Sequence, residues 1–220
     1  MSQKKKTNQN QKTAPKNALT LRHYINLGVI FLLLCLLGYM AFNYIKPTSD
    51  SPTAQENNRA LIGGPFTLVD HTGKTVQETD YAGKYMLVYF GYTFCPDVCP
   101  TDLQAIADSL DMLPEEVTKK ITPLFISIDP ERDTVDIMKQ YIGLFHPQLI
   151  GLTGSVEQVN LAKKSYRVWA SKEENDGSSD YLVNHTSYIY LMDPDGLYVT
   201  HYRHGVLPND MAASLRENIK

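Results

Sequence analysis

Cys95 and Cys99 form a CPDVC motif in which three residues separate the two thiols. At the start of a helix, side chains four positions apart lie on one face about 5–6 Å apart, so the two sulfurs can bind one metal ion or form a redox-active disulfide. The positive end of the helix dipole and the free N–H groups there stabilise a thiolate. Pro96 fits the first turn, where a missing N–H costs little, and Pro100, one turn further on, is tolerable near the helix start. The motif therefore predicts reactive thiols of low pKa.

The segments around this motif predict strands that alternate with helices. Residues 84–92 are almost continuously apolar, as in a buried central strand, and residues 95–113 have the apolar spacing of a helix. The other expected elements are a hairpin (65–70 and 75–77), strands at 121–129 and 149–154, helices at 133–146, 155–170 and 208–220, and a hairpin over 185–205. Asp133, Ser155 and either Asn209 or Asp210 are the expected N-caps.

This order predicts an α/β fold with a mixed sheet flanked by helices. A central strand that ends at a cysteine motif opening a helix is a thioredoxin-like arrangement, and residues 133–154 are then an insertion or crossover within it. Residues 172–180 form an expected polar loop, and residues 193–196, Asp-Pro-Asp-Gly, form the turn of the last hairpin.

A third metal ligand has to come from one of six histidines. Five are expected in ordinary roles: His23, His71, His146, His201 and His204. In thioredoxin-like proteins a cis-proline precedes the strand that lies beside the cysteine motif. Here His185 precedes that strand, TSYIYLMD, so we expect its side chain to face the thiols. Two cysteines and one histidine suit copper as Cu(I) and as Cu(II).

The N-terminal quarter predicts a membrane anchor. Residues 25–45 contain no charged side chain and would span about 31 Å as a helix at ~1.5 Å per residue, which matches a hydrocarbon core of about 30 Å. Cys35 lies within this span and is expected to be a packing or lipid-facing residue. The alternative, a cleaved signal peptide, has a shorter apolar region and a small-residue cleavage site.

The charge distribution predicts the orientation of the chain and its domains. Residues 1–23 hold six basic and no acidic side chains, and positive flanks stay on the cytoplasmic side. We expect a cytoplasmic leader (1–23), a single inner-membrane span (24–45), a linker (46–59) and a folded domain (60–220) in a periplasm or an intermembrane space. Beyond residue 23 the chain has 15 basic and 24 acidic side chains, which argues against nucleic acid as a partner.

Three segments resemble the Sco/SenC family, copper chaperones of cytochrome c oxidase assembly. They are YFGYTFCPDVCPTDL (89–103), FISIDPERDT (125–134) and VNHTSYIYLMDPDG (183–196). The resemblance covers about residues 60–220 and implies a thioredoxin-like fold with copper bound by Cys95, Cys99 and His185. It also implies delivery of copper to cytochrome c oxidase subunit II, an upstream periplasmic copper donor, and contact between Asp129 and the partner protein.

Three other functions remain open at this point. A thiol–disulfide reductase would use Cys95 and Cys99 to keep the cysteines of the oxidase copper site reduced, so whether the chain is an enzyme stays undecided. A peroxiredoxin-like peroxidase needs a threonine and an arginine beside its cysteine; Thr93 is close in sequence, but no arginine is obviously placed. A copper or redox sensor would bind without transferring the metal.

Overall fold

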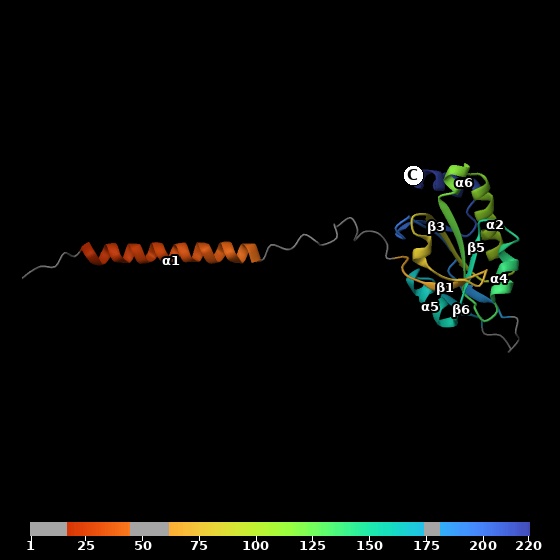
Figure 1. The fold of residues 1–220 in the computed structure, drawn as a ribbon, viewed down its shortest axis with the longest axis horizontal. Coiled ribbons are helices and arrows are strands. Elements are labelled where there is room, and N and C mark those ends of the chain that lie inside the picture. Colours follow the sequence, from red (N-terminus) through yellow and green to blue (C-terminus); the bar gives the residue numbers. More distant parts are fainter. Residues whose placement is uncertain (1–16, 45–61, 174–180) are drawn as a thin grey trace, which may run out of the picture. The chain divides into compact units, whose positions relative to one another are not determined.

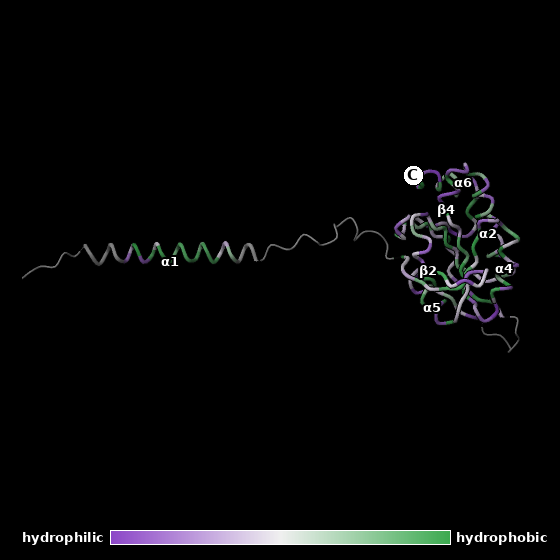
Figure 2. Tube along the Cα trace, in the orientation of Figure 1, coloured by the Kyte–Doolittle hydropathy of each residue, from purple (hydrophilic) through white to green (hydrophobic). Residues whose placement is uncertain are grey.

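The computed structural model describes residues 17–44, 62–173 and 181–220. The chain divides into two compact units, and the first consists, in its described part, of the helix α1 (Asn17–Tyr44). Its residues 23–40 are exposed, and α1 is long and apolar enough to cross a membrane (Figure 2). The helix begins seven residues before the expected start of the span at residue 24. Most of the expected leader and all of the linker (46–59) lie outside the described residues.

The second unit is built on a seven-stranded mixed sheet (Figure 1). The strand order is β2-β1-β5-β4-β3-β8-β9. The strands are β1 (Thr67–Asp70), β2 (Thr75–Gln77), β3 (Tyr85–Gly91), β4 (Ile121–Ser127), β5 (Ile150–Thr153), β8 (Tyr188–Met192) and β9 (Tyr198–Arg203). β3, β4 and β5 run parallel, and every other pair in the sheet is antiparallel. The predicted thioredoxin-like α/β fold is confirmed.

Helices cover both faces of this sheet. They are α2 (Val98–Asp111), α3 (Glu115–Thr118), α4 (Val135–Ile142), α5 (Val156–Ser165) and α6 (Pro208–Asn218), with a short 3-10 helix, η2 (Glu78–Tyr81). α2 contacts α6, α4 contacts β5, and α5 contacts β1. α5 lies on the side of the sheet away from α2 and α4 (Figure 1). The expected helices and main-sheet strands occur in the predicted order, but α3 and η2 were not predicted, and the helix expected over 155–170 ends at Ser165.

β3 is the central strand that carries the chain to the cysteine motif. Six of its seven residues are buried, as expected for a strand flanked by neighbours and covered on both faces. It ends at Gly91, where a β-carbon would lie 2.8 Å from the Cys99 sulfur and 2.8 Å from Phe125. A larger residue than glycine would therefore push the sulfur or the neighbouring ring out of place.

The structure adds a second, two-stranded sheet that the sequence does not predict. β6 (Ala170–Lys172) and β7 (Val183–His185) pair antiparallel, and we call this pair the ribbon. The ribbon borders the expected polar loop, of which residues 174–180 lie outside the described part. No strand of the ribbon is hydrogen-bonded into the seven-stranded sheet within the described residues.

Of the three expected N-caps, one is confirmed and two are wrong. Ser155 caps α5 with a full capping box, as predicted. Thr134 rather than Asp133 caps α4, because the Asp133 carboxylate is buried and accepts other hydrogen bonds. α6 has Leu207 at its N-cap position and no side-chain cap, because the leucine side chain has no hydrogen-bond acceptor, and Pro208 is its first helical residue.

Candidate metal centre

The two cysteines lie at the junction between β3 and α2, and both are free thiols. Cys99 is in the first turn of α2 and is 0% exposed, whereas Cys95 is partly exposed in the preceding loop. The backbone N–H of Cys99 donates a hydrogen bond to the Cys95 sulfur, with a distance of 3.4 Å. The first turn of α2 thus binds the Cys95 sulfur, although Cys95 itself lies before the helix.

The prediction that the helix begins at Cys95 is wrong, because α2 begins at Val98. Pro96 is the physical reason: the residue before a proline is forced out of the helical region of backbone angles. Pro100 falls at the third helical position, where no intrahelical hydrogen bond needs its N–H. The two sulfurs are brought together by a loop folding over the helix start, not by four-residue spacing along one helix.

His185 lies beside these thiols, as the sequence predicts. It is the last residue of β7, and its Nε2 atom is 3.6 Å from the Cys99 sulfur. Two ligands of one metal ion, with bonds of ~2.3 Å to sulfur and ~2.0 Å to nitrogen, are about 3.5 Å apart. The separation of Cys99 and His185 fits that requirement.

The imidazole is held in the form that binds metal. Its Nδ1 atom lies 3.0 Å from the carbonyl oxygen of Thr186, which can only accept a hydrogen bond. Nδ1 therefore donates, and the Nε2 lone pair points to the cysteines. Burial lowers the pKa of His185, so the ring is neutral near pH 7.

The two thiols differ in their readiness to ionise. Hydrogen bonds from the Cys99 thiol and from the backbone N–H groups of Cys99 and Asp97 lower the pKa of Cys95 to about 5. The neighbouring Cys95 thiolate and burial raise the pKa of Cys99. The metal-free pair thus carries one thiolate, on the exposed side, and one thiol, on the buried side.

Two of the three side chains, Cys95 and His185, border one opening, and Cys99 is buried, so the three do not form a closed cage. A cavity of about 220 Å³ is lined by Cys95, His185, Tyr92 and Glu173, among others. Within the described ranges, no three His, Cys, Asp or Glu side chains are gathered as a complete metal cluster. The arrangement brings the donors to one place and leaves one side open.

Aromatic rings frame the imidazole. The rings of Tyr89 and Tyr92 lie edge-on to His185, with centroids 6.5 Å and 6.1 Å away. The Tyr92 hydroxyl accepts a hydrogen bond from the backbone N–H of Val183, with a distance of 3.2 Å. β3 and the loop after it therefore orient the histidine as well as the cysteines.

The other histidines of the second unit have separate partners. His71 accepts from the Gly151 N–H, His146 lies near Asp111, and His201 contacts the Tyr198 hydroxyl. His204 Nδ1 is 2.8 Å from a carboxylate oxygen of Asp102, a buried residue one helical turn after Cys99. His23 lies in α1. The expectation that these histidines play ordinary roles agrees with these contacts.

Asp129 follows β4 and is 1% exposed. One carboxylate oxygen accepts from the Tyr181 hydroxyl at 2.7 Å, and the other accepts from Arg132 Nε at 2.5 Å. The predicted contact of Asp129 with a partner protein therefore requires these two hydrogen bonds to open first. The expected role stays a prediction.

Sequence reasoning missed Arg132, Asp133 and Tyr181. Arg132 lies over the rings of Tyr181 and Phe94, at 3.7 Å and 4.8 Å from the ring centroids. Arg132 is thus an arginine near Thr93 that the sequence analysis did not place. Its guanidinium is already engaged by these rings and by Asp129. The two aspartates of DPERD, four positions apart, were the available signal for this cluster.

The chain matches a model of the SCO1/SenC family over residues 54–220. It is 42% identical over 162 residues to the mitochondrial SCO2 homolog of Danio rerio, a match covering 73% of this chain and 58% of that protein. The matches to the mitochondrial SCO1 homologs of Homo sapiens and Arabidopsis thaliana cover 54% and 43% of those proteins, so the chain spans about half the length of these curated relatives.

Two solved structures are similar in fold and sequence. ScoI of Arabidopsis thaliana with copper bound has a TM-score of 0.65 and 41% identity, covering 71% of this chain and 97% of that one. ScoI of Bradyrhizobium japonicum with copper bound has a TM-score of 0.66 and 43% identity, covering 72% of this chain and 99% of that one. By family match, sequence identity and fold, this chain belongs to the SCO1/SenC family.

Proposed function

We propose that this chain is a membrane-tethered copper carrier that binds copper through Cys95, Cys99 and His185. The observation that carries the proposal is the neutral imidazole whose Nε2 lone pair faces the Cys99 thiol at 3.6 Å, with the Cys95 sulfur held on the same helix start. Sulfur and imidazole ligands suit copper in both oxidation states. Two solved relatives, at 41% and 43% identity, contain copper.

The open side of the site supports transfer rather than permanent storage. Two of the three protein ligands, Cys95 and His185, border a cavity of about 220 Å³, which leaves room for the ligands of a second protein to approach the metal. Cys95 lies at the exposed edge of this opening. A closed set of four protein ligands would be harder to unload.

Family membership supports cytochrome c oxidase assembly as the process, with subunit II as the acceptor and a periplasmic protein as the copper donor. The six basic residues within residues 1–23, five before α1 and Arg22 inside it, support a translocated domain. We therefore propose a cytoplasmic leader (1–23), an inner-membrane span (24–45), a linker (46–59) and a copper-binding domain (60–220) in the periplasm or an intermembrane space.

Copper loading of the full chain in detergent tests the ligand set. We expect one copper per chain, and X-ray absorption at the copper edge should show two sulfur neighbours and one nitrogen neighbour. In the His185→Ala variant the nitrogen neighbour from imidazole should disappear. A wild-type chain that binds no copper, or a His185→Ala chain with an unchanged absorption spectrum, would contradict the proposal.

A second candidate, a thiol–disulfide reductase, is favoured by the low pKa of Cys95, about 5. The Cys95 thiolate would attack a partner disulfide and release one partner thiolate. Cys99, once deprotonated, would then attack the Cys95 sulfur, leaving a Cys95–Cys99 disulfide and a second partner thiolate. If cells carrying His185→Ala assemble normal oxidase while the Cys95–Cys99 pair still cycles, the reductase function is the correct one.

A further inference from the structure

His185 lies on an element that the main sheet does not hold. In the ribbon, Ala170 is paired with His185 and Lys172 with Val183, and the Thr186 N–H donates to the Trp169 carbonyl oxygen. Neither strand joins the seven-stranded sheet within the described residues. The position of the imidazole therefore depends on how the ribbon is attached to the rest of the domain.

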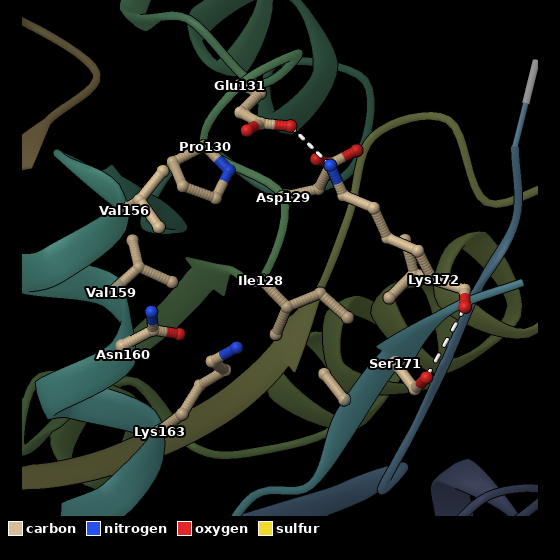
Figure 3. Close-up of a pocket in the computed structure, with 12 residues that line it drawn as sticks. Ile128, Asp129, Pro130, Glu131, Val156, Val159, Asn160, Lys163, Ser171 and Lys172 are labelled. Atoms are coloured by element: carbon tan, nitrogen blue, oxygen red, sulfur yellow. Dashed lines mark hydrogen bonds and ion pairs between the residues drawn. The ribbon is translucent and has the colours of Figure 1, made fainter. Parts of the chain in front are cut away.

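Apolar packing attaches the ribbon only in part. A cavity of about 220 Å³ separates β6 from α5, and its wall includes Val156, Val159, Lys163 and Ser171 (Figure 3). On another side lies the cavity bordered by Cys95 and His185. Of the six ribbon residues only Val183 is buried in the core, and with cavities on two sides the rest of the ribbon is packed less closely than the strands of the main sheet.

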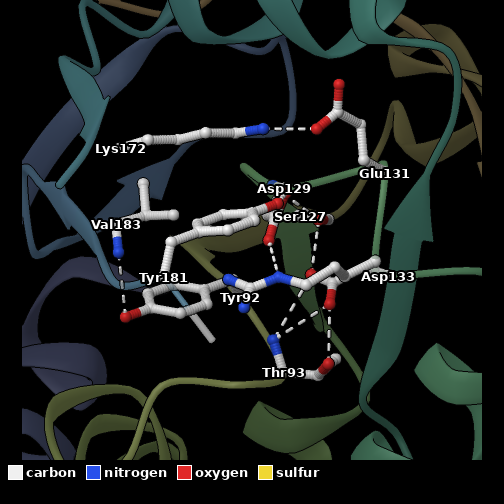
Figure 4. A network of polar contacts seen from close by, with 10 residues as sticks. Tyr92, Thr93, Ser127, Asp129, Glu131, Asp133, Lys172, Tyr181 and Val183 are labelled. Atoms are coloured by element: carbon white, nitrogen blue, oxygen red, sulfur yellow. Dashed lines mark hydrogen bonds and ion pairs between the residues drawn. The ribbon is translucent and has the colours of Figure 1, made fainter. Parts of the chain in front are cut away.

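Polar contacts attach the ribbon to the turn formed by residues 129–133. The Tyr181 hydroxyl, two residues before β7, donates to one Asp129 oxygen, and Arg132 Nε donates to the other (Figure 4). The Arg132 guanidinium also lies 3.7 Å from the centre of the Tyr181 ring. Because Asp129 is buried, these charge-assisted contacts are stronger than they would be in water.

The same turn is attached to the cysteine loop at its other end. One Asp133 oxygen accepts from the Thr93 hydroxyl at 2.6 Å and from the Thr93 N–H at 3.2 Å. The Ser127 hydroxyl donates to the other oxygen at 2.6 Å (Figure 4). Thr93 precedes Cys95 by two residues, so the turn 129–133 is bonded both to the segment that carries the thiols and to the segment that carries the imidazole.

We propose that Asp129 and Asp133 are positioning residues of the metal site, and that the Tyr181–Asp129 hydrogen bond holds the imidazole of His185 in reach of the thiols. Opening this bond frees the ribbon and moves the imidazole away, while the cysteines stay on α2 and its preceding loop. The part of this inference that concerns copper rests on the proposed function. The part that concerns the ribbon does not need the metal.

The test uses the full chain in detergent and the variant Tyr181→Phe, which removes the hydroxyl and keeps the ring for Arg132. The matched control is Tyr198→Phe, which removes a tyrosine hydroxyl bonded to His201 on β9. In copper-free protein, hydrogen exchange over residues 181–188 should be about tenfold faster in Tyr181→Phe than in wild type. The control should exchange as wild type does.

With Cu(I) loaded, release to the chelator bathocuproine disulfonate should also be about tenfold faster in Tyr181→Phe. The temperature of unfolding should not change, because the ribbon opens without the main sheet. Asp129→Asn provides a second variant, in which ribbon exchange and copper release should also be faster than in wild type. A merely structural role would lower the unfolding temperature and leave ribbon exchange, measured well below that temperature, as in wild type.

Ribbon exchange equal to wild type in both variants would overturn the inference, and so would faster exchange that leaves copper release unchanged in a chain that binds copper. If the wild-type chain binds no copper, the proposed function fails. The exchange experiment still decides whether Asp129 holds the ribbon.

Discussion

The two halves of the candidate metal site are built differently. The thiols lie where a buried strand of the domain, β3, meets α2, and the Cys99 sulfur fits against Gly91 with no room for a β-carbon. The imidazole lies on a short ribbon with cavities of about 220 Å³ beside it. A site with one fixed half and one separately attached half can keep its metal and still open. The predictions below test this contrast.

The largest expected effect is on copper affinity when one ligand in each half of the site is replaced. Cys99→Ala should lower Cu(I) affinity by more than the roughly 10–100-fold that loss of an outer-shell partner costs. His185→Ala leaves both thiols, so Cu(I) affinity should fall only about tenfold, or ~1.4 kcal/mol, while Cu(II) binding is lost. Competition with a Cu(I) chelator and the Cu(II) absorption spectrum measure the two effects. Equal losses of Cu(I) affinity would show that the halves are equivalent.

The fixed half should be sensitive to added volume. Gly91→Ala places a β-carbon 2.8 Å from the Cys99 sulfur and from Phe125, and overpacking of this kind costs about 1–3 kcal/mol. We expect a lower free energy of unfolding in urea and weaker Cu(I) binding. Gly151→Ala is the control, since its β-carbon meets Met138 in α4 and overpacks the domain away from the thiols. Weaker copper binding in both variants would contradict a specific role for Gly91.

The thiols themselves should respond to pH unequally. Alkylation of Cys95 by iodoacetamide in metal-free protein should reach half its maximal rate near pH 5, and Cys99 should stay unmodified up to neutral pH. The pKa of Cys95 is depressed in the folded state from ~8.5, so its ionisation stabilises the fold above that pH. That contribution disappears as the pH falls through about 5. Peptide mapping by mass spectrometry measures both rates, and a half-maximal pH near 8.5 would contradict the assigned hydrogen bonds.

The smallest effect is expected at the solvent-exposed ion pair of the ribbon, Lys172 and Glu131. Both side chains are about half exposed, and such pairs contribute little because water and salt screen them. Glu131→Gln should leave ribbon exchange and copper release within error of wild type. A change as large as that of Tyr181→Phe would show that this ion pair, and not Asp129, attaches the ribbon.

The same contrast explains how far the sequence predicts the structure. The central strand, the helix after the cysteines and the last hairpin have strong apolar patterns, and their order and type are confirmed. The ribbon has two strands of three residues each with no such pattern, so the sequence predicted the end of a helix at Ala170, a polar loop after it and the start of the last hairpin at His185. Local rules also fail where tertiary contacts compete. Asp133 has the residue type of an N-cap, but its carboxylate is buried beneath Thr93.

The proximity of the proposed metal donors could be predicted from the sequence, but their arrangement could not. His185 was found from its place before the last hairpin, and it lies beside Cys99. The hydrogen bond between Tyr181 and Asp129 joins residues 52 positions apart, so no local sequence pattern indicates it. Pro96 carried a signal for the true helix start, because it excludes Cys95 from the helix.

The Cys95 thiolate has a consequence for heat resistance. Hydrogen bonds lower the pKa of this partly exposed thiol to about 5, so the metal-free domain holds a negative charge in the loop before α2. A cation bound there is attracted to this charge in the folded chain, so the loaded protein should unfold at a higher temperature than the empty one.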